Sequence, residues 1–117
     1  DGKWYYLTKD GALMGNQYID GKYYYFDPVN GDMKTGWLSE QQNSNTIWNY
    51  FDPESGAKVE GWQQIDGKWY YFGDDGYMVK DNWVGDYYLG RDGAMLEGGY
   101  TPDGIRVGGN GKKITAR

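Results

Sequence analysis

The sequence predicts an all-β fold, a solenoid of about five stacked β-hairpins with a terminal cap, on three observations. The wording DGKWYY or a close variant recurs along the chain, and a glycine-containing turn pair follows each recurrence. No segment places apolar residues at the i, i+3, i+4 and i+7 spacing of an amphipathic helix. Units this short cannot bury a core alone, so we expect each hairpin to be stabilised by its neighbours, as in a solenoid of stacked repeats.

The composition predicts a thin core made mainly of aromatic side chains. The chain has 117 residues, with six Trp, 13 Tyr and three Phe. A large aromatic side chain can bury about 150–250 Å², so these rings can supply the apolar area that scarce aliphatic residues do not. The 20 glycines indicate frequent turns.

Each predicted hairpin begins with an aromatic cluster and turns at a glycine. The clusters begin at Trp4, Tyr23, Trp48, Trp69 and Asp86. The turn pairs are Asp10-Gly11, Asn30-Gly31, Ser55-Gly56, Asp75-Gly76 and Asp92-Gly93. A shorter second strand then ends in an aromatic residue, at Tyr18, Trp37, Trp62, Trp83 and Tyr100. Because glycine supplies the positive φ of tight turns, we expect cluster, turn and second strand to form one hairpin.

The positions of the clusters and turns predict a single repeat module over residues 1–117. The predicted repeats are 1–19, 20–42, 43–65, 66–84 and 85–97, with the terminal cap at 98–117. Residues 38–47 are polar and lack glycine, which predicts an extended loop. In the cap, residues 101–104 predict a turn and residues 105–107 a last short strand. Since Asp1 lies inside a repeat, we expect a fragment of a longer protein whose export signal, if it has one, lies upstream.

Several function classes are disfavoured by composition. The chain has no Cys and no His, which removes thiol nucleophiles, imidazole bases and the usual zinc ligands, and we predict no metal site and no cofactor. Carboxylate pairs such as Asp74-Asp75, or Asp52 with Glu54, recur in turn signals and are interpreted as turn formers. We therefore predict no enzyme activity in this chain; any catalysis would lie in another domain.

Charge and hydropathy narrow the partners further. The formal net charge of −5 argues against nucleic acid and favours a cationic or neutral ligand. No apolar run approaches the roughly 18 residues that span a bilayer, so we expect no membrane insertion.

The aromatic spacing favours recognition of a diffuse cation. Successive strand residues alternate faces, so Trp69 and Tyr71 share one face while Tyr70 takes the other. Rings from both strands of a hairpin and a third from the next can form a three-walled box. Such a box attracts quaternary ammonium groups by about 0.5–2 kcal/mol per well-placed ring.

Two segments carry a family resemblance. Residues 61–78, GWQQIDGKWYYFGDDGYM, and residues 30–37, NGDMKTGW, resemble the cell-wall-binding repeats, also called choline-binding repeats, of Gram-positive surface proteins. The resemblance covers residues 1–97, and TPDGIRV at 101–107 is similar to the family's terminal hairpin. It implies a left-handed solenoid that binds choline units of teichoic acid between repeats, in a secreted protein associated with the cell wall.

The resemblance also implies ligand-binding residues. The family's box combines the Trp of the GW element, the first aromatic of the WYY element and an aromatic of the next repeat, often with a Met nearby. One box would be Trp37, Trp48 and Tyr71, and a second Trp62, Trp69 and Tyr88, with Met78 beside the second. The choice of Tyr71 and Tyr88 rests on strand alternation. Weaker candidates are Tyr18, Tyr23 and Tyr50 at the first junction, and Trp83 at the fourth, where Asp86 replaces an aromatic residue.

The predicted function is thus a non-catalytic module that binds choline-decorated teichoic acid or cell-wall polysaccharide, with the terminal repeats as candidates for homodimer contacts. Two alternatives stay open at this point. A glucan- or carbohydrate-binding module would stack its flat aromatics on sugar rings. A structural spacer or self-association module would use the same rings only to hold the hairpins together.

Overall fold

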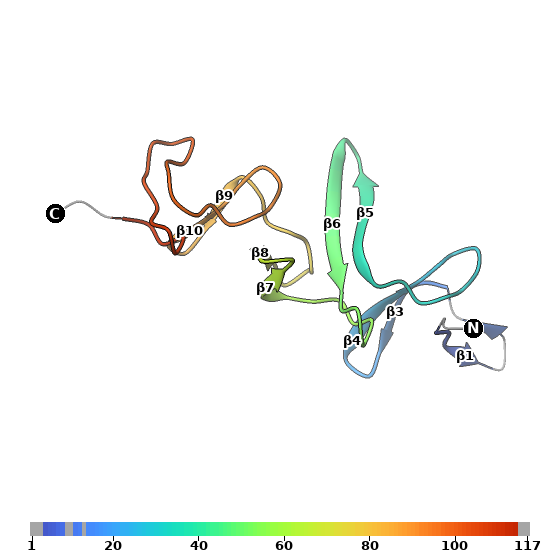
Figure 1. The fold of residues 1–117 in the computed structure, drawn as a ribbon. Coiled ribbons are helices and arrows are strands. Elements are labelled where there is room, and N and C mark those ends of the chain that lie inside the picture. Colours follow the sequence, from blue (N-terminus) through green and yellow to red (C-terminus); the bar gives the residue numbers. More distant parts are fainter. Residues whose placement is uncertain (1–3, 9–10, 13, 115–117) are drawn as a thin grey trace. The chain divides into compact units, whose positions relative to one another are not determined.

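The computed structural model describes residues 4–8, 11–12 and 14–114 (Figure 1). The chain forms two compact units, Asp1–Val59 and Glu60–Arg117. Within the described residues every regular element is a β-strand and no helix occurs. This confirms the all-β prediction, whereas the handedness of the superhelix, the single module and the repeat limits stay predictions.

The first unit contains three antiparallel hairpins. Their strands are β1 (Leu7–Thr8) with β2 (Gly11–Ala12), β3 (Gly15–Ile19) with β4 (Lys22–Phe26), and β5 (Gly36–Gln42) with β6 (Asn45–Phe51). The β3–β4 turn consists of Asp20 and Gly21, both at positive φ (52° and 85°). Positive φ at both central residues is the geometry that matches the twist of paired strands.

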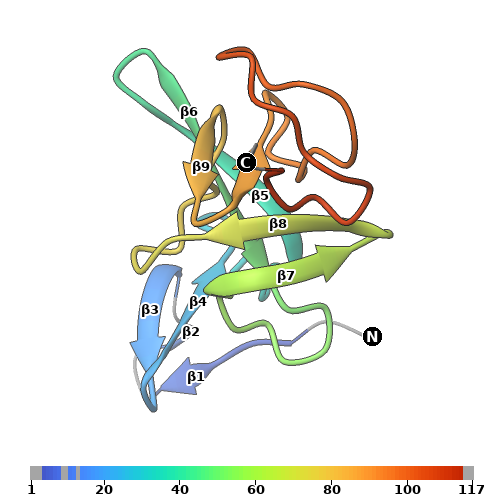
Figure 2. The same cartoon turned by 90° about the vertical axis from the view of Figure 1, so that its left-hand side faces the viewer.

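The second unit contains two hairpins and the cap. Their strands are β7 (Gly61–Ile65) with β8 (Lys68–Phe72), and β9 (Asn82–Val84) with β10 (Tyr87–Leu89). Figure 2 shows β7 and β8 as an open antiparallel pair. Their turn, Asp66 and Gly67, repeats the positive φ values of the β3–β4 turn (52° and 82°).

The predicted strand pairing is wrong in direction. Four of the five aromatic clusters pair backward with the strand before them, as in β7–β8, instead of forward across the following glycine turn. The first cluster pairs forward, through Leu7 with Ala12. The physical reason is that the two-residue turns between these strands give a tight hairpin, which the longer glycine turns do not. The turns predicted at residues 30–31, 55–56, 75–76 and 92–93 do form, but each returns the chain only to a single bridging pair. These pairs are Phe26 with Met33, Phe51 with Lys58, Phe72 with Met78, and Leu89 with Met95.

Two local predictions also need correction. The loop predicted at residues 38–47 is instead part of the longest hairpin, β5–β6, because Asn43 takes the positive φ (58°) that glycine usually supplies. Gln41 Nε2 donates a hydrogen bond across this hairpin to Thr46 Oγ1 at 2.9 Å. Gly11 lies in β2 and not in a turn, and its predicted partner Asp10 lies outside the described residues.

The cap consists of turns and isolated bridging pairs. The turn predicted at residues 101–104 forms, with Gly104 N–H donating to the Thr101 carbonyl at 2.9 Å. In place of the strand predicted at 105–107, Arg106 bridges to Tyr100 and Val107 to Lys113. Both pairs lie within the cap, and a further bridging pair, Tyr87 with Lys112, joins the cap to β10.

Among the described residues, the most deeply buried apolar side chains lie at the ends of the cluster strands. Phe26 and Phe51 occupy this position in the first unit, and Phe72 and Leu89 in the second, with at most 3 % of any of them exposed. Val107 takes the same role in the cap. Because Phe, Leu and Val fill these positions, most of the Trp and Tyr side chains are left partly on the surface, although Tyr88 is buried.

The turn carboxylates act as predicted. Asp52 Oδ1 accepts the backbone N–H groups of Glu54 and Ser55 at 2.8 and 2.9 Å, and Asp75 Oδ1 accepts that of Tyr77 at 2.9 Å. The N–H donors of Ser55 and Glu54 lower the pKa of Asp52. Carboxylates bonded in this way stabilise turns and are poorly suited to acid–base chemistry.

Candidate functional site

A ring-walled hollow of about 330 Å³ opens in the second unit. We call it the Met95 hollow; its lining residues are Trp62, Trp69, Tyr87, Met95 and Asn110. Trp62 comes from β7, Trp69 from β8 and Tyr87 from β10, so two consecutive hairpins build it. No carboxylate and no cationic side chain is among these lining residues.

Strand register places the first two rings on one face of a hairpin. Trp62 pairs with Tyr71 and Gln64 pairs with Trp69, two residues along the ladder, so all four side chains share a face. The Trp62 ring meets Tyr71 edge-on, with ring centroids 5.2 Å apart and an interplanar angle of 67°. It meets Tyr87 of the next hairpin in the same way, at 5.5 Å and 76°. Trp62 is thereby held between two tyrosines, a geometry that fixes its orientation.

Met95 is held at the hollow by its backbone and by a glycine. Its N–H donates to the Trp69 carbonyl at 2.8 Å. Gly111 has φ +87°, and a Cβ added there would lie 2.5 Å from Met95 Cε. A side chain at this position would be strained by the positive φ and would displace the end of Met95, whose polarisable sulfur suits an aromatic site.

Two of the predicted residues meet here and two do not. Trp62 and Trp69 line the same hollow, as the second predicted box requires. Tyr88 is 8 % exposed and packs against Trp83 at 5.3 Å, so it contributes no wall; its neighbour Tyr87 does. Met78 lies beside Gly93, and its place at the hollow is taken by Met95.

The alternation argument failed because it treated both hairpins alike. Trp69 and Tyr71 do share a face, but the next hairpin faces this hollow with its opposite side. That side carries the middle residue of the cluster, Tyr87, instead of Tyr88. In the first unit the middle residue Tyr24 likewise reaches the hollow of the preceding cluster.

The first predicted box is assembled in part. Trp37 and Trp48 lie with ring centroids 6.0 Å apart and edge-on at 85°. Tyr50, a weaker candidate for another junction, is the strand partner of Trp37 and packs on it at 5.1 Å. Tyr71 belongs to the second unit, so the box of Trp37, Trp48 and Tyr71 stays a prediction.

A second hollow, which the sequence did not predict, lies in the first unit. It has a volume of about 340 Å³, and its lining includes Trp4, Tyr24 and Met33. We call it the Met33 hollow. Met33 N–H donates to the Trp4 carbonyl at 2.7 Å, and a Cβ on Gly56 would collide with Met33 Sδ. The signal that could have revealed it was the combination of a cluster-first Trp, the middle Tyr of the next cluster and a Met after the glycine turn.

The remaining candidates lie beside lysines. Tyr18 and Tyr23 are strand partners with ring centroids 4.7 Å apart, and Lys58 Nζ lies 5.3 Å from the Tyr23 centroid. Lys113 Nζ lies 5.7 Å from the Trp83 centroid, and Trp83 Nε1 donates to Asp103 at 3.3 Å. We call these the Lys58 junction and the Lys113 junction.

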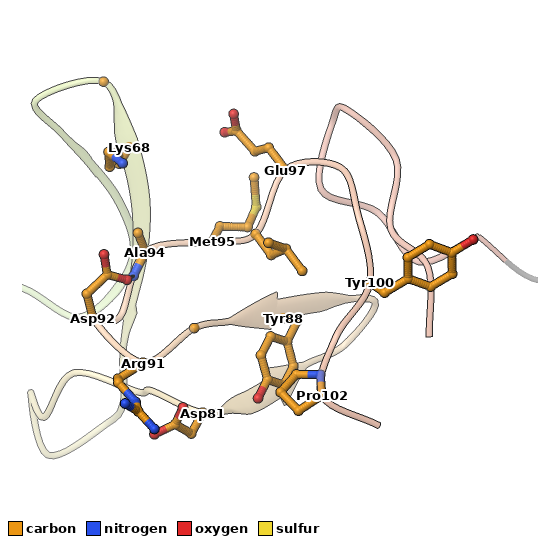
Figure 3. Close-up of a pocket in the computed structure, with 13 residues that line it drawn as sticks. Lys68, Asp81, Tyr88, Arg91, Asp92, Ala94, Met95, Glu97, Tyr100 and Pro102 are labelled. Carbon is orange, nitrogen blue, oxygen red and sulfur yellow. Dashed lines mark hydrogen bonds between the residues drawn. The ribbon is translucent and has the colours of Figure 1, made fainter. Parts of the chain in front are cut away.

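A larger polar groove of about 680 Å³ also lies in the second unit (Figure 3). Lys68 and Arg91 line it together with the carboxylates Asp81, Asp92 and Glu97. Figure 3 shows the Tyr100 ring at its edge, and 69 % of that residue is exposed. Its mixture of donors, acceptors and one exposed ring differs from the apolar Met95 hollow.

The described residues form neither a metal site nor a membrane-spanning helix. Across residues 4–8, 11–12 and 14–114, no group of three acidic side chains could hold a metal ion. The same residues include no helix that is long and apolar enough to cross a membrane.

Fold and site together define a hairpin-repeat binding module with ring-walled sites. Comparison with family models matches a "Choline-binding repeat" over residues 77–112 and another over residues 13–60. A "Putative cell wall binding repeat" matches residues 1–13 and 60–78. The chain belongs to the choline-binding repeat family, as the resemblance in its sequence predicted.

Solved structures and curated proteins agree with this assignment. Choline binding protein F from Streptococcus pneumoniae, solved in the presence of a peptidoglycan analogue, is 38 % identical and has a TM-score of 0.80; the match covers 98 % of this chain and 38 % of that one. The choline binding domain of another Streptococcus pneumoniae protein is 32 % identical, with a TM-score of 0.55 over 70 % of this chain and 96 % of that one. Glucosyltransferase-S of Streptococcus mutans is 38 % identical over 72 % of this chain but only 7 % of its own length. The chain thus spans a small part of the curated enzymes that it matches.

Proposed function

We propose that the chain is a non-catalytic module that holds choline-like quaternary ammonium groups of a cell-wall polymer in ring-walled hollows. The observation that carries this proposal is the Met95 hollow, where Trp62, Trp69 and Tyr87 converge beside a methionine. The negative faces of such rings attract a diffuse cation by about 0.5–2 kcal/mol each. Since no carboxylate lines the hollow, a strongly hydrated ammonium would lose its water shell without compensation.

We propose that the polymer is choline-decorated teichoic acid or a related wall polysaccharide. The module would bind it at the cell surface, as part of a secreted protein. Single hollows bind weakly, but several hollows on one chain raise the affinity for a polymer by linking the binding events. The acidic balance, with a net charge of −5, favours the cationic head group. The homodimer through the terminal repeats stays a prediction.

The test is a titration of intrinsic fluorescence with choline, followed by the same titration of Trp62→Ala. We expect a millimolar dissociation constant, an order-of-magnitude figure from a few kcal/mol of ring attraction. Ethanolamine, whose ammonium carries no methyl groups, is the matched ligand and should bind more weakly. Equal responses to both ligands, or no response to saturating choline, would contradict the proposal.

A second candidate function is glucan binding, favoured by the polar groove and its exposed Tyr100 (Figure 3). Flat rings stack on sugar faces, and the side chains of Lys68, Arg91 and Asp92 could bond hydroxyl groups. The match to a streptococcal glucosyltransferase supports the same candidate. A glucan oligosaccharide that shifts the fluorescence of the wild-type chain, but not of Tyr100→Ala, would favour this function. A chain that responds to neither ligand would be a structural spacer.

A further inference from the structure

One backbone position recurs in both units and carries either methionine or lysine. In the hollows, Met95 N–H donates to the carbonyl of Trp69 and Met33 N–H to that of Trp4. At the junctions, Lys113 N–H donates to Asp86 at 2.7 Å and Lys58 N–H to Tyr23 at 2.8 Å. In each case the acceptor is the first residue of an aromatic cluster. The four side chains therefore start from equivalent points on the repeat.

At the two junctions the lysine ammonium lies near a ring face. Lys113 Nζ is 5.7 Å from the Trp83 centroid, and Lys58 Nζ is 5.3 Å from the Tyr23 centroid. Both distances lie within the roughly 6 Å at which a cation is attracted to an aromatic face. The chain thus supplies its own cation at the rings that a ligand would otherwise use.

Lysine also accompanies the loss of an aromatic wall. Strand register makes Trp83, paired with Tyr88, the counterpart of Trp62, paired with Tyr71. At the Lys113 junction, Asp86 therefore occupies the position that Trp69 occupies in the Met95 hollow, so this aromatic wall is missing. At the Lys58 junction, the middle residue of the next cluster is the buried Asn49, where the Met95 hollow has Tyr87.

Charge around the Lys113 junction keeps the ammonium in place. Asp103 accepts hydrogen bonds from the Thr101 hydroxyl and, at 3.3 Å, from Trp83 Nε1. The Thr101 bond is the main cause that lowers the pKa of Asp103, and the charge of Lys113 lowers it further. An ionised Asp103 beside Trp83 attracts the lysine cation toward the same ring.

We propose that Lys58 and Lys113 are tethered occupants that close their junctions to quaternary ammonium ligands. This inference rests on the proposed function, because it assigns the binding capacity to the methionine hollows and withholds it from the lysine junctions. A tethered group competes at an effective concentration in the millimolar range or above, which is comparable with the affinity of a single box. A second cation would in addition be repelled by the lysine charge.

The test restores the missing wall and varies only the lysine. Two variants are compared: Asp86→Trp alone, and Asp86→Trp combined with Lys113→Met. Tetramethylammonium is the probe, and the signal is the ¹H–¹⁵N indole resonance of each tryptophan during titration. We expect the tetramethylammonium concentration that half-saturates the shift of the Trp83 resonance to be at least about tenfold lower in the double variant than in the single one. The matched control is Lys112→Met in the Asp86→Trp background, because Lys112 is the exposed neighbour of Lys113. This control should behave like Asp86→Trp alone.

The indoles of Trp62 and Trp69 report on the proposed function in the same samples. If they move while Trp83 responds equally in the single and double variants, the lysine inference is overturned and the proposed function stands. If they stay still while Trp83 moves only in the double variant, the Met95 hollow fails and the lysine inference is supported. If no indole moves in any sample, both are overturned. Unchanged Trp62 and Trp69 resonances without probe verify that each variant is folded.

Discussion

The Met95 hollow and the Lys113 junction, both in the second unit, have the same backbone arrangement but different side chains. In each, a bridging residue donates its N–H to the first residue of a cluster, and a Trp–Tyr strand pair stands beside it. One combines Trp69 with Met95, and the other combines Asp86 with Lys113. The difference teaches that the repeat scaffold and the binding site are determined by different residues.

The scaffold residues are buried, and the site residues are not. Phe72 and Leu89 are fully buried, whereas 37 % of Trp69 is exposed. An exposed wall can be exchanged for a carboxylate without disturbing the core, because its ring contributes little interior packing. Ring-walled and lysine-filled junctions can therefore alternate along one fold.

The largest expected effect comes from removing the scaffold that both sites share. Phe72→Ala should cost about 3–5 kcal/mol of stability, because Phe72 is completely buried and its loss leaves a cavity. Denaturant unfolding measures this cost, with Trp69→Ala as the partly exposed control. If the two variants lost equal stability, the distinction between scaffold and site residues would be wrong.

The next largest effect tests the role of Gly111, which packs against Met95 at the hollow. Gly111→Ala should destabilise the second unit by about 1–3 kcal/mol, since Ala is strained at positive φ and its Cβ collides with Met95. We also expect weaker choline binding, measured by fluorescence titration. Gly109→Ala is the control, because a Cβ there meets open space, and it should change neither stability nor binding.

A smaller effect distinguishes the two sites by ligand response. Trp62→Ala should weaken choline binding at the Met95 hollow about tenfold or more while the chain stays folded, because a large part of one wall is lost. Trp83→Ala should leave choline affinity unchanged, since its ring already faces Lys113. The two titrations are compared by calorimetry, and equal losses would erase the contrast between the sites.

The smallest effect is a pH response confined to the Lys113 junction. The folded-state pKa of Asp103 lies below its unfolded value, chiefly because of its Thr101 hydrogen bond. The stabilisation is therefore complete above the unfolded value and is lost as pH falls through the folded pKa, below about pH 4. The Trp83 indole resonance should shift over this range. Asp103→Asn should abolish the shift, and a shift that persists would assign it to another group.

Much of the architecture was accessible from the sequence. The recurring clusters predicted the β-hairpins, the Asp-Gly, Asn-Gly and Ser-Gly signals predicted the turns after them, and the GW and WYY elements predicted that Trp62 meets Trp69. These features depend on residues close together in the chain. Local backbone preference and the two-residue period of a strand are sufficient to determine them.

The strand pairing has a local signal too, the two-residue Asp-Gly turns at 20–21 and 66–67, which the sequence prediction overlooked. Tertiary structure alone decided the third wall of the site. Alternation establishes which residues share a face within β10, but it does not say which face meets the preceding hairpin. The packing of consecutive repeats decides this, and it selects Tyr87 over Tyr88 and Met95 over Met78. The same packing brings Lys113 to Trp83, 30 residues away in the sequence. Such contacts depend on the rotation between neighbouring repeats, which no short segment specifies by itself.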